Sequence, residues 1–457
     1  MPQTQATGSM NANSTSWPPP QPTTETEAEA KRWPPVETMH STLLGLAFAS
    51  VGIAPRAAPV VLVGLALLTL IEALRSGVSP KHAFTVVFSQ LPLLAALAFL
   101  AFSGLSALWA ADRQLALQSV LQVGLVVLAT GTITGLMPEF LARLPQRRRL
   151  RFVRAIPLGG GLGLAFVLTE FATGNAISLA LVSRFPDLMG DNNKDFVREG
   201  TRLLGFAPFY LDRNVAALAL AMPAVLLAIH GWLDPFRAAW ALGLTLMVAI
   251  AVLALSWSGA AKFGALCGVL AALALWRWPK LVIPAMTASL TAGISLALPL
   301  GHLPARLGLD KAAWMPPSAR ERVVIWDRTA TAAWRSPVVG IGVQSTRFQA
   351  TASPVRIEGV RGPRRELGWH AHNFVLQSWL ETGAIGALLL LAVALSALRA
   401  LAILPTTGAP AGMALFVMVA AVGVTGWGLW QPWLIAVIGT AIAGLRIDCA
   451  AGPAAAR

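Results

Sequence analysis

The chain is organised around long apolar segments separated by short polar loops. Crossing the hydrocarbon core of a bilayer as a helix takes about 20 predominantly apolar residues. By this measure the sequence predicts an all-α, polytopic membrane helix bundle of about twelve transmembrane helices, with a large helical loop between spans nine and ten. The predicted spans, the first of them short, are 41–54, 57–74, 83–109, 114–137, 152–172, 213–230, 238–256, 259–276, 280–300, 371–398, 410–428 and 431–446.

Composition agrees with a membrane protein. Hydrophobic residues make up 56% of the chain and charged residues only 12%, whereas charged residues make up about a quarter of a soluble domain. The net charge of +14 therefore indicates membrane orientation and anionic lipid contacts before it indicates nucleic acid. Because no RNA- or DNA-binding module is visible, we expect no nucleic-acid partner. Cys267 and Cys449 give no disulfide framework.

The polar ends of the chain are predicted to lie outside the bundle. Residues 1–40 are rich in Pro, Thr and Gln, and they lack the basic and apolar regions of a signal peptide. We expect them to form a disordered cytoplasmic tail. Residues 447–457 would form a second cytoplasmic tail, and 41–446 the transmembrane domain.

Basic residues are concentrated in one alternating set of loops, above all in residues 143–154. Because basic residues collect on the cytoplasmic side, we predict that this stretch and both termini are cytoplasmic. Residues 173–212 and 301–370 would then lie outside. In a bacterial inner membrane, the outside is the periplasm.

The long outer loop, residues 301–370, is itself basic and partly helical. It carries eleven Lys or Arg against five acids, which indicates an anionic ligand. Within it, residues 316–342 predict a helix that begins with a capping box of Ser318 and Glu321 and ends at Pro337. An apolar stripe predicts that this helix lies over the bundle as a lid, and the stripe consists of Val323, Trp326, Ala330 and Ala333.

The tenth span opens with a set of polar residues. His370 and His372 precede it, and Asn373, Gln377 and Glu381 recur every four residues, so they share one helix face. Polar groups in lipid are costly, so this face should line the bundle interior or a water-filled cavity. It is either a hydrogen-bond seam between helices or one wall of an active cavity.

Candidate chemistry gathers on the outer face of the predicted bundle. Arginine side chains bind diphosphate oxygens bidentately, and histidine suits a general base because it titrates near neutral pH. Such a set is typical of an enzyme that handles a membrane-anchored phosphate, although the lysine also fits a snorkelling side chain. The set consists of Arg213, Lys262, Arg322, Arg347 and His372.

Other chemistries lack their sequence motifs. The sequence has no phosphate-binding Gly-x-x-x-x-Gly-Lys loop and no His-Glu-x-x-His zinc motif. His370 and His372 have no nearby acid or cysteine set to complete a metal site. We therefore expect neither a cofactor nor a metal. A twelve-span transporter and a membrane scaffold remain alternatives, although no internal repeat typical of transporters is visible.

Two motifs carry a resemblance to a known family. They are "RVVIWDRTATAAWRSPVVGIG" (322–342) and "HAHNFVLQSWLETGAIG" (370–386), supported by "LDRNVAALALAMP" and "SWSGAAKFG". With the twelve spans and the large outer loop, they resemble the O-antigen ligase and O-antigen polymerase superfamily over most of residues 41–446. Many relatives carry Ser-Arg after the seventh span, where this chain has Ser258-Gly259 and then Lys262.

The resemblance implies a GT-C-like glycosyltransferase that requires no metal or nucleotide sugar. The donor would be a glycan on undecaprenyl diphosphate, and the acceptor would be lipid A–core for a ligase or a second lipid-linked glycan for a polymerase. We expect a ligase rather than a polymerase, because the candidate cations form one cluster. We also expect a monomer among membrane lipids. By position in the motifs, the predicted catalytic residues are His372, Arg322 and Arg213. The predicted substrate-binding residues are Arg347, Lys262, His370, Asn373, Gln377, Glu381 and Trp326.

Overall fold

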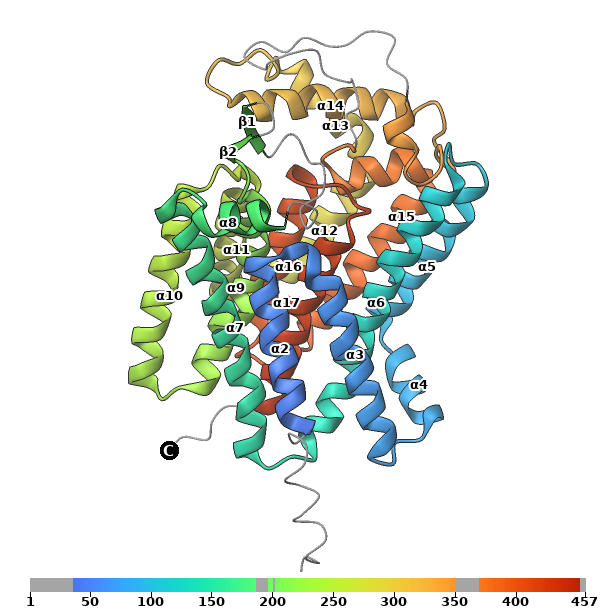
Figure 1. Cartoon of the computed structure of the whole chain (residues 1–457). Coiled ribbons are helices and arrows are strands. Elements are labelled where there is room, and N and C mark those ends of the chain that lie inside the picture. Colours follow the sequence, from blue (N-terminus) through green and yellow to red (C-terminus); the bar gives the residue numbers. More distant parts are fainter. Residues whose placement is uncertain (1–35, 186–195, 200–201, 350–369, 453–457) are drawn as a thin grey trace, which may run out of the picture. The chain divides into compact units, whose positions relative to one another are not determined.

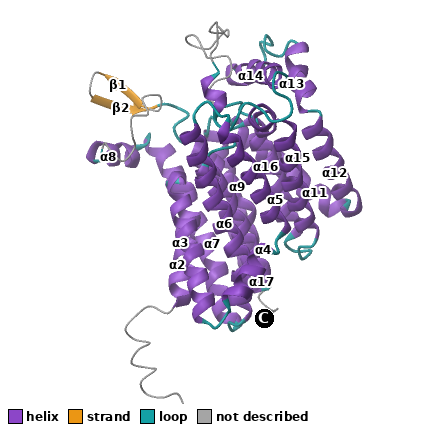
Figure 2. Ribbon diagram, turned by 90° about the vertical axis from the view of Figure 1, so that its right-hand side faces the viewer, coloured by secondary structure: helices purple, strands orange, loops and turns teal. Residues whose placement is uncertain are grey.

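The computed structural model describes residues 36–185, 196–199, 202–349 and 370–452, and the chain divides into two compact units, residues 1–39 and 40–457. In the second unit, long helices run side by side, as Figure 1 and Figure 2 show. The helices are α2 (Val36–Ile53), α3 (Ala58–Arg75), α4 (Pro80–Phe88), α5 (Leu91–Leu105), α6 (Arg113–Ala142), α7 (Gln146–Thr173), α8 (Ala176–Arg184), α9 (Asp212–Trp232), α10 (Pro235–Leu255), α11 (Gly259–Arg277), α12 (Pro279–Ser295), α13 (Ala297–Arg306), α14 (Pro317–Ala333), α15 (Phe374–Ala402), α16 (Ala409–Thr425) and α17 (Pro432–Ala451).

The predicted spans all fall on these helices. Among the described residues, ten helices are long and apolar enough to cross a membrane, and the bent pair α12–α13 makes up to eleven. The remaining predicted span, 410–428, corresponds to α16, a shorter apolar helix of 17 residues. The all-α, polytopic membrane bundle is therefore confirmed.

Three predicted spans are not the single helices that hydropathy indicates. Residues 83–109 are divided between α4 and α5, where Pro92 occupies the first turn of α5, a position that suits a residue without a backbone N–H. Residues 280–300 bend by 78° between α12 and α13. The helix predicted at 371–398 begins at Phe374 and is broken at Gly383.

The ends of the helical domain also differ from the predicted boundaries. Helix α2 begins at Val36, so residues 36–40 are helical rather than part of a tail, and residues 1–35 lie outside the described residues. Helix α17 continues to Ala451 and includes residues 447–451 of the predicted second tail. Residues 301–306 of the predicted outer loop belong to α13.

The core of the bundle is formed around α9 and α17. In its most apolar window, α9 is 72% buried and α17 is 61% buried, whereas α10 and α11 are only 17% and 22% buried. Helices α10 and α11 expose large side chains such as Trp240 and Trp276. Low burial and exposed apolar side chains are expected for peripheral helices that face lipid. A polar site is therefore expected at the ends of the buried central helices.

The two ends of the bundle carry different contacts. At one end, His40 stacks on Phe140 with ring centroids 5.2 Å apart, and Arg154 lies 5.4 Å from the centre of the Trp232 ring. The basic stretch 143–154 therefore lies at this end of the bundle. Asp212, at the beginning of α9, lies at the opposite end, where α14 and α13 are also found (Figure 1). Which end faces the cytoplasm stays a prediction.

The predicted outer loop, residues 301–370, contains the predicted lid helix, α14, which runs across one end of the bundle (Figure 1). Its stripe is inward as predicted, because Val323, Ala330 and Ala333 are buried. The predicted capping box is wrong. Pro316 is the N-cap, it makes no side-chain cap, and Ser318 lies inside the helix. The predicted loop 173–212 contains α8 and an antiparallel hairpin of β1 (Phe196–Glu199) and β2 (Arg202–Phe206), which hydropathy did not predict.

Candidate functional site

The histidine pair lies at the entry to α15. The rings of His370 and His372 have centroids 4.1 Å apart, and the backbone N–H of His372 donates to Nδ1 of His370 over 3.2 Å. His372 has a left-handed φ of +51°, an unusual conformation for a residue with a side chain. Asn373 then caps α15, because its Oδ1 accepts from the N–H groups of Val375 and Leu376. The chain is therefore held tightly where the two rings meet.

The hydrogen bonds distinguish the two histidines by tautomer. Nδ1 of His372 lies 2.6 Å from the carbonyl oxygen of Gly426, which can only accept, so Nδ1 carries the proton and Nε2 keeps its lone pair. Nδ1 of His370 accepts from a backbone N–H, so the proton of neutral His370 is on Nε2. Only His372 therefore presents Nε2 as a base.

Burial and positive charge keep both imidazoles neutral. The pKa of His370 is lowered to about 3 by burial, then by His372, Arg347 and Arg322. The pKa of His372 is lowered to about 4 by burial and then by Arg322, although the hydrogen bond to Gly426 opposes this shift. Both rings are thus uncharged at pH 7. The structure brings the histidines together with two of the three predicted diphosphate-binding arginines.

Burial and acidic neighbours have opposite effects on the pKa of Arg322. Its pKa is lowered from its ordinary value by burial, and the charges of Glu321 and Asp212 act in the opposite direction. Asp212, at the first turn of α9, accepts a hydrogen bond of 3.0 Å from the backbone N–H of Trp257. Sequence reasoning missed Asp212, although the quoted motif "LDRN" contains it.

Arg213 and Lys262 reach different surroundings from the histidine pair. The guanidinium of Arg213 lies 5.5 Å from the centre of the Trp433 ring on α17, in a cation–π contact. Lys262 is exposed, its Nζ is 3.4 Å from the carbonyl oxygen of Ala254, and its charge acts on Asp212. Arg213 thus follows Asp212 directly in the chain, and the charge of Lys262 acts on Asp212.

Arg347 is positioned by a polar chain. Its Nη2 donates to Oε1 of Gln344 over 2.6 Å, and Nε2 of Gln344 donates to the hydroxyl of Ser119 over 2.8 Å. Gln344 has a left-handed φ of +62°. The turn that carries Arg347 is thereby tied to α6, which fixes its charge near His370.

The polar face of α15 forms a seam between helices. Glu381 is 1% exposed and accepts from the hydroxyl of Thr346 at 2.6 Å and from the indole N–H of Trp430 at 2.5 Å. Gln377 donates to Glu381 and accepts from the backbone N–H of Leu429. Asn373 is a cap, and the other two side chains bond to protein, so this face forms a hydrogen-bond seam between helices. Its predicted substrate-binding role stays a prediction.

The two family-like motifs meet at a break in α15. Gly383 has φ +64° and ψ −162°, so the helix is interrupted there. The carbonyls of Leu380 and Glu381 accept from the N–H groups of Ile341 and Gly342. In return, the N–H groups of Ala384 and Ile385 donate to the carbonyls of Pro337 and Val338. The segment Pro337–Gly342 therefore replaces part of the hydrogen bonding of α15, and we call this arrangement the docked turn.

Trp326 is half-buried on α14 and packs beside the small buried residues of the stripe. Its indole nitrogen is buried, and within the described residues it has no hydrogen-bond partner. The structure thus gives Trp326 a packing role and leaves its predicted substrate contact as a prediction.

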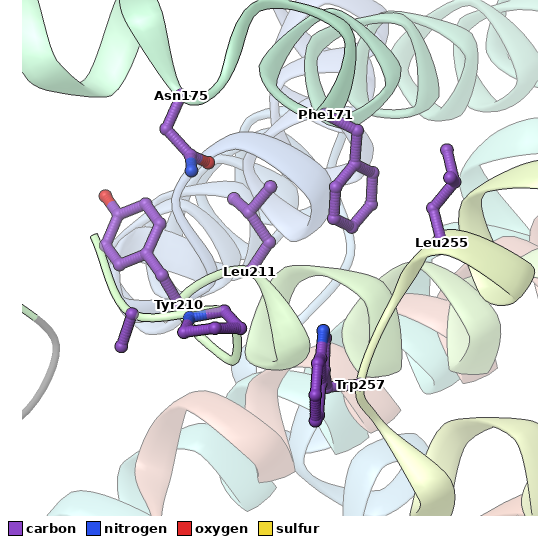
Figure 3. Close-up of a pocket in the computed structure, with 8 residues that line it drawn as sticks. Phe171, Asn175, Tyr210, Leu211, Leu255 and Trp257 are labelled. Atoms are coloured by element: carbon purple, nitrogen blue, oxygen red, sulfur yellow. The ribbon is translucent and has the colours of Figure 1, made fainter. Parts of the chain in front are cut away.

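A cavity of about 200 Å³ opens near Asp212 rather than at His372. Figure 3 shows the side chains around it. It is lined by Phe171, Asn175, Ala207, Pro208, Tyr210, Leu211, Leu255 and Trp257.

Comparison with known proteins identifies the family-like part of the chain. Residues 203–391 match a family model described as O-antigen ligase. This stretch runs from β2 through α14 into α15, and it contains Asp212, Arg322 and both histidines. The resemblance to the O-antigen ligase superfamily is therefore confirmed over these residues.

Three curated relatives are each named "Putative polysaccharide ligase". The protein from Rickettsia conorii is 29% identical over 120 residues, and those from Rickettsia prowazekii and Rickettsia typhi are 29% identical over 121 residues. Each match covers 26% of this chain and 29% or 30% of the relative. Less than a third of the relatives' length is thus matched. The matched stretch is thus similar to part of proteins named for polysaccharide ligation, and it lies in a chain with many helices apolar enough to span a membrane.

Proposed function

We propose that this chain is a glycosyltransferase of the bacterial inner membrane that moves a glycan from undecaprenyl diphosphate to a periplasmic acceptor hydroxyl. The acceptor proposed is lipid A–core, which makes the enzyme a ligase. The observation that carries the proposal is the neutral His372, with Nδ1 bonded to Gly426 and Nε2 left as a base, in the field of Arg322.

The proposed reaction needs no external energy source, because the bond between the sugar and the diphosphate is already activated. The acceptor oxygen attacks the anomeric carbon as Nε2 of His372 takes its proton. The bond from the anomeric carbon to the diphosphate oxygen breaks, and the diphosphate leaves with the electron pair. Attack from the face opposite the leaving group inverts the anomeric centre.

Arg322 and Arg347 are assigned to the leaving group. Negative charge grows on the diphosphate during bond cleavage, and fixed positive groups in a partly buried site stabilise it. Both arginines act on the histidine pair electrostatically, so they lie near the point of attack. Arg213, which follows Asp212 in the chain, and Lys262, whose charge acts on Asp212, are assigned to the same donor.

The reaction is tested with purified full-length protein and a lipid-linked glycan. We expect transfer only when lipid A–core is supplied, and none with the His372→Ala variant. Chain growth without any core acceptor would instead identify a polymerase. Transfer that is unaffected by His372→Ala would contradict the assigned base.

A further inference from the structure

The cavity beside Asp212 has walls of a particular chemistry. Phe171 comes from the end of α7, Tyr210 from the turn before α9, and Trp257 from the turn between α10 and α11 (Figure 3). Three aromatic side chains from separate segments thus surround one space. Aromatic rings present flat apolar faces, and Tyr and Trp add polar groups at their edges.

The size of the cavity limits what it can hold. Pockets for drug-sized molecules occupy about 300–1,000 Å³, whereas this cavity measures about 200 Å³. It therefore suits a single small ring. A pyranose ring has apolar C–H faces and a rim of hydroxyls, which matches aromatic faces combined with an amide.

Asn175 supplies the amide. Its Oδ1 is buried, and within the described residues it has no hydrogen-bond partner. A buried acceptor left without a donor costs about 1–3 kcal/mol. In Figure 3 the amide group points toward Tyr210 and Leu211. A half turn of this group exchanges its oxygen and nitrogen, so a ligand hydroxyl in the cavity can pair with either.

The turn that carries Asn175 is fixed before any ligand arrives. Asn175 has a left-handed φ of +67°, and its backbone N–H donates to the carbonyl of Glu170 over 2.7 Å. The carboxylate of Glu170, fully buried, accepts from the N–H groups of Ile177 and Ser178. Tyr210 is held by stacking on Phe206, with ring centroids 4.0 Å apart. Such preorganisation reduces the entropic cost of binding.

The cavity adjoins the charged site. Leu211 and Trp257 both line it, and the backbone N–H of Trp257 donates to the carboxylate of Asp212. The charge of Asp212 acts on Arg322. A ligand in the cavity therefore lies next to the group that helps to hold Arg322.

We propose that this cavity is a saccharide subsite, which holds one pyranose ring against Trp257 and Tyr210 with a ring hydroxyl on Asn175. The identification of the ring as part of the transferred or accepting glycan rests on the proposed function. Aromatic side chains also collect at membrane interfaces, so occupation by a lipid chain is the contrary outcome of the test.

Saturation-transfer NMR on the full-length protein in detergent tests the subsite. The probes are free glucose, galactose, rhamnose and N-acetylglucosamine, with a short-chain polyprenol as the lipid probe. We expect transfer to at least one sugar. Trp257→Ala and Asn175→Gly should each reduce it about fivefold or more, and Trp257→Phe should retain about half. The Gly variant removes the amide but tolerates the left-handed backbone.

The matched control is Trp314→Ala, because Trp314 is 78% exposed and does not line the cavity. Sugar signals that are absent, or equal in all variants, overturn the subsite. The subsite is also overturned if Trp257→Ala weakens the polyprenol signal but none of the sugar signals.

The same variants separate this inference from the proposed reaction. His372→Ala should keep sugar binding while it loses glycan transfer. Sugar binding at Trp257 in a protein without transferase activity supports the subsite and contradicts the proposed function. Glycan transfer that is unchanged by Trp257→Ala, in a protein that gives no sugar signal, contradicts the subsite and leaves the proposed function intact.

Discussion

At the scale of single residues, one carbonyl oxygen distinguishes the two histidines, because it fixes the tautomer of His372. The oxygen of Gly426 accepts from Nδ1 of His372 and leaves the lone pair on Nε2. His370, in contrast, uses its own Nδ1 lone pair to hold the backbone of His372. We infer that His370 is a positioning residue and His372 the catalytic base.

The two alanine variants should therefore differ. General-base catalysis contributes typically 10²–10⁴-fold, so His372→Ala should lower kcat by at least about a hundredfold. His370→Ala removes one hydrogen bond to the backbone and should cost about tenfold or less. The measurement is initial transfer rate with both proteins at equal membrane abundance. Small and equal losses in both variants would refute this division of roles.

The pH dependence follows from the charges around His372. Burial and Arg322 both disfavour the imidazolium, which lowers the pKa of His372 to about 4. The neutral base is present above this pKa, so kcat/KM should be level from about pH 8 to pH 5 and should fall as pH drops through 4.

Arg322→Gln removes the repelling charge but keeps a polar side chain. The pKa of His372 should rise, and the acid limb of the profile should move to higher pH, whatever the loss in absolute rate. Arg322→Lys is the control, because it keeps the charge and should leave the limb in place while it lowers the rate. Identical limbs in the Gln variant and the wild type would argue against the electrostatic contact.

At the scale of elements, the docked turn depends on two glycines with left-handed backbones. Gly340 has φ +67° and Gly383 has φ +64°. A Cβ at Gly340 would lie 2.4 Å from the carbonyl carbon of Glu381, and one at Gly383 would lie 2.3 Å from the carbonyl oxygen of Val338. Because these contacts are with backbone, no side chain can move aside to relieve them.

Gly340→Ala and Gly383→Ala should each destabilise the protein. The backbone strain alone costs about 1–3 kcal/mol, and separation of the turn from α15 adds to it. The measurement is the thermal unfolding midpoint in detergent. Gly243→Ala on α10 is the matched control, since nothing lies within 4 Å of its added Cβ. A midpoint for the docked-turn variants equal to that of the control would contradict this account.

The sequence predicts the helices better than the breaks within them. Hydropathy finds each span because burial in lipid demands a continuous apolar run. The break at Gly383 has no local cause of that kind, because it is stabilised by hydrogen bonds from residues about forty positions earlier. The error at Ser318 is local instead. Ser318 and Glu321 have the residue types and spacing of a capping box, but the helix begins two residues earlier, with Pro316 as the N-cap.

At the scale of the whole molecule, orientation can be tested with two exposed positions. Thr331 on α14 and Arg148 in the basic stretch are both exposed. In a Cys267→Ser, Cys449→Ser background, a membrane-impermeant maleimide should label Thr331→Cys in intact cells. Arg148→Cys should react only after the membrane is opened. The reverse pattern would place the proposed active site in the cytoplasm.

The site could be predicted only in part from the sequence. Arg322, Arg347 and the histidines stand out in the sequence because arginine and histidine carry recognisable chemistry, and the structure brings them near one another. Their roles stay predictions. Asp212 was missed, because an acid at a helix start is also a common N-terminal residue. Gly426 was invisible to sequence reasoning, since a backbone carbonyl has no residue-type signal, although it sets the tautomer of His372.

The docked turn also has a consequence for biogenesis. In an unbroken helix, the carbonyls of Leu380 and Glu381 would pair with the N–H groups of Ala384 and Ile385, and all four groups pair instead with residues 337–342. In lipid, unpaired backbone groups cost several kcal/mol each. We therefore expect the newly made α15 to enter the bilayer as one straight helix. It would exchange these bonds for those of the docked turn only when residues 337–342 fold back onto it, which makes completion of the seam at Glu381 a late step of assembly.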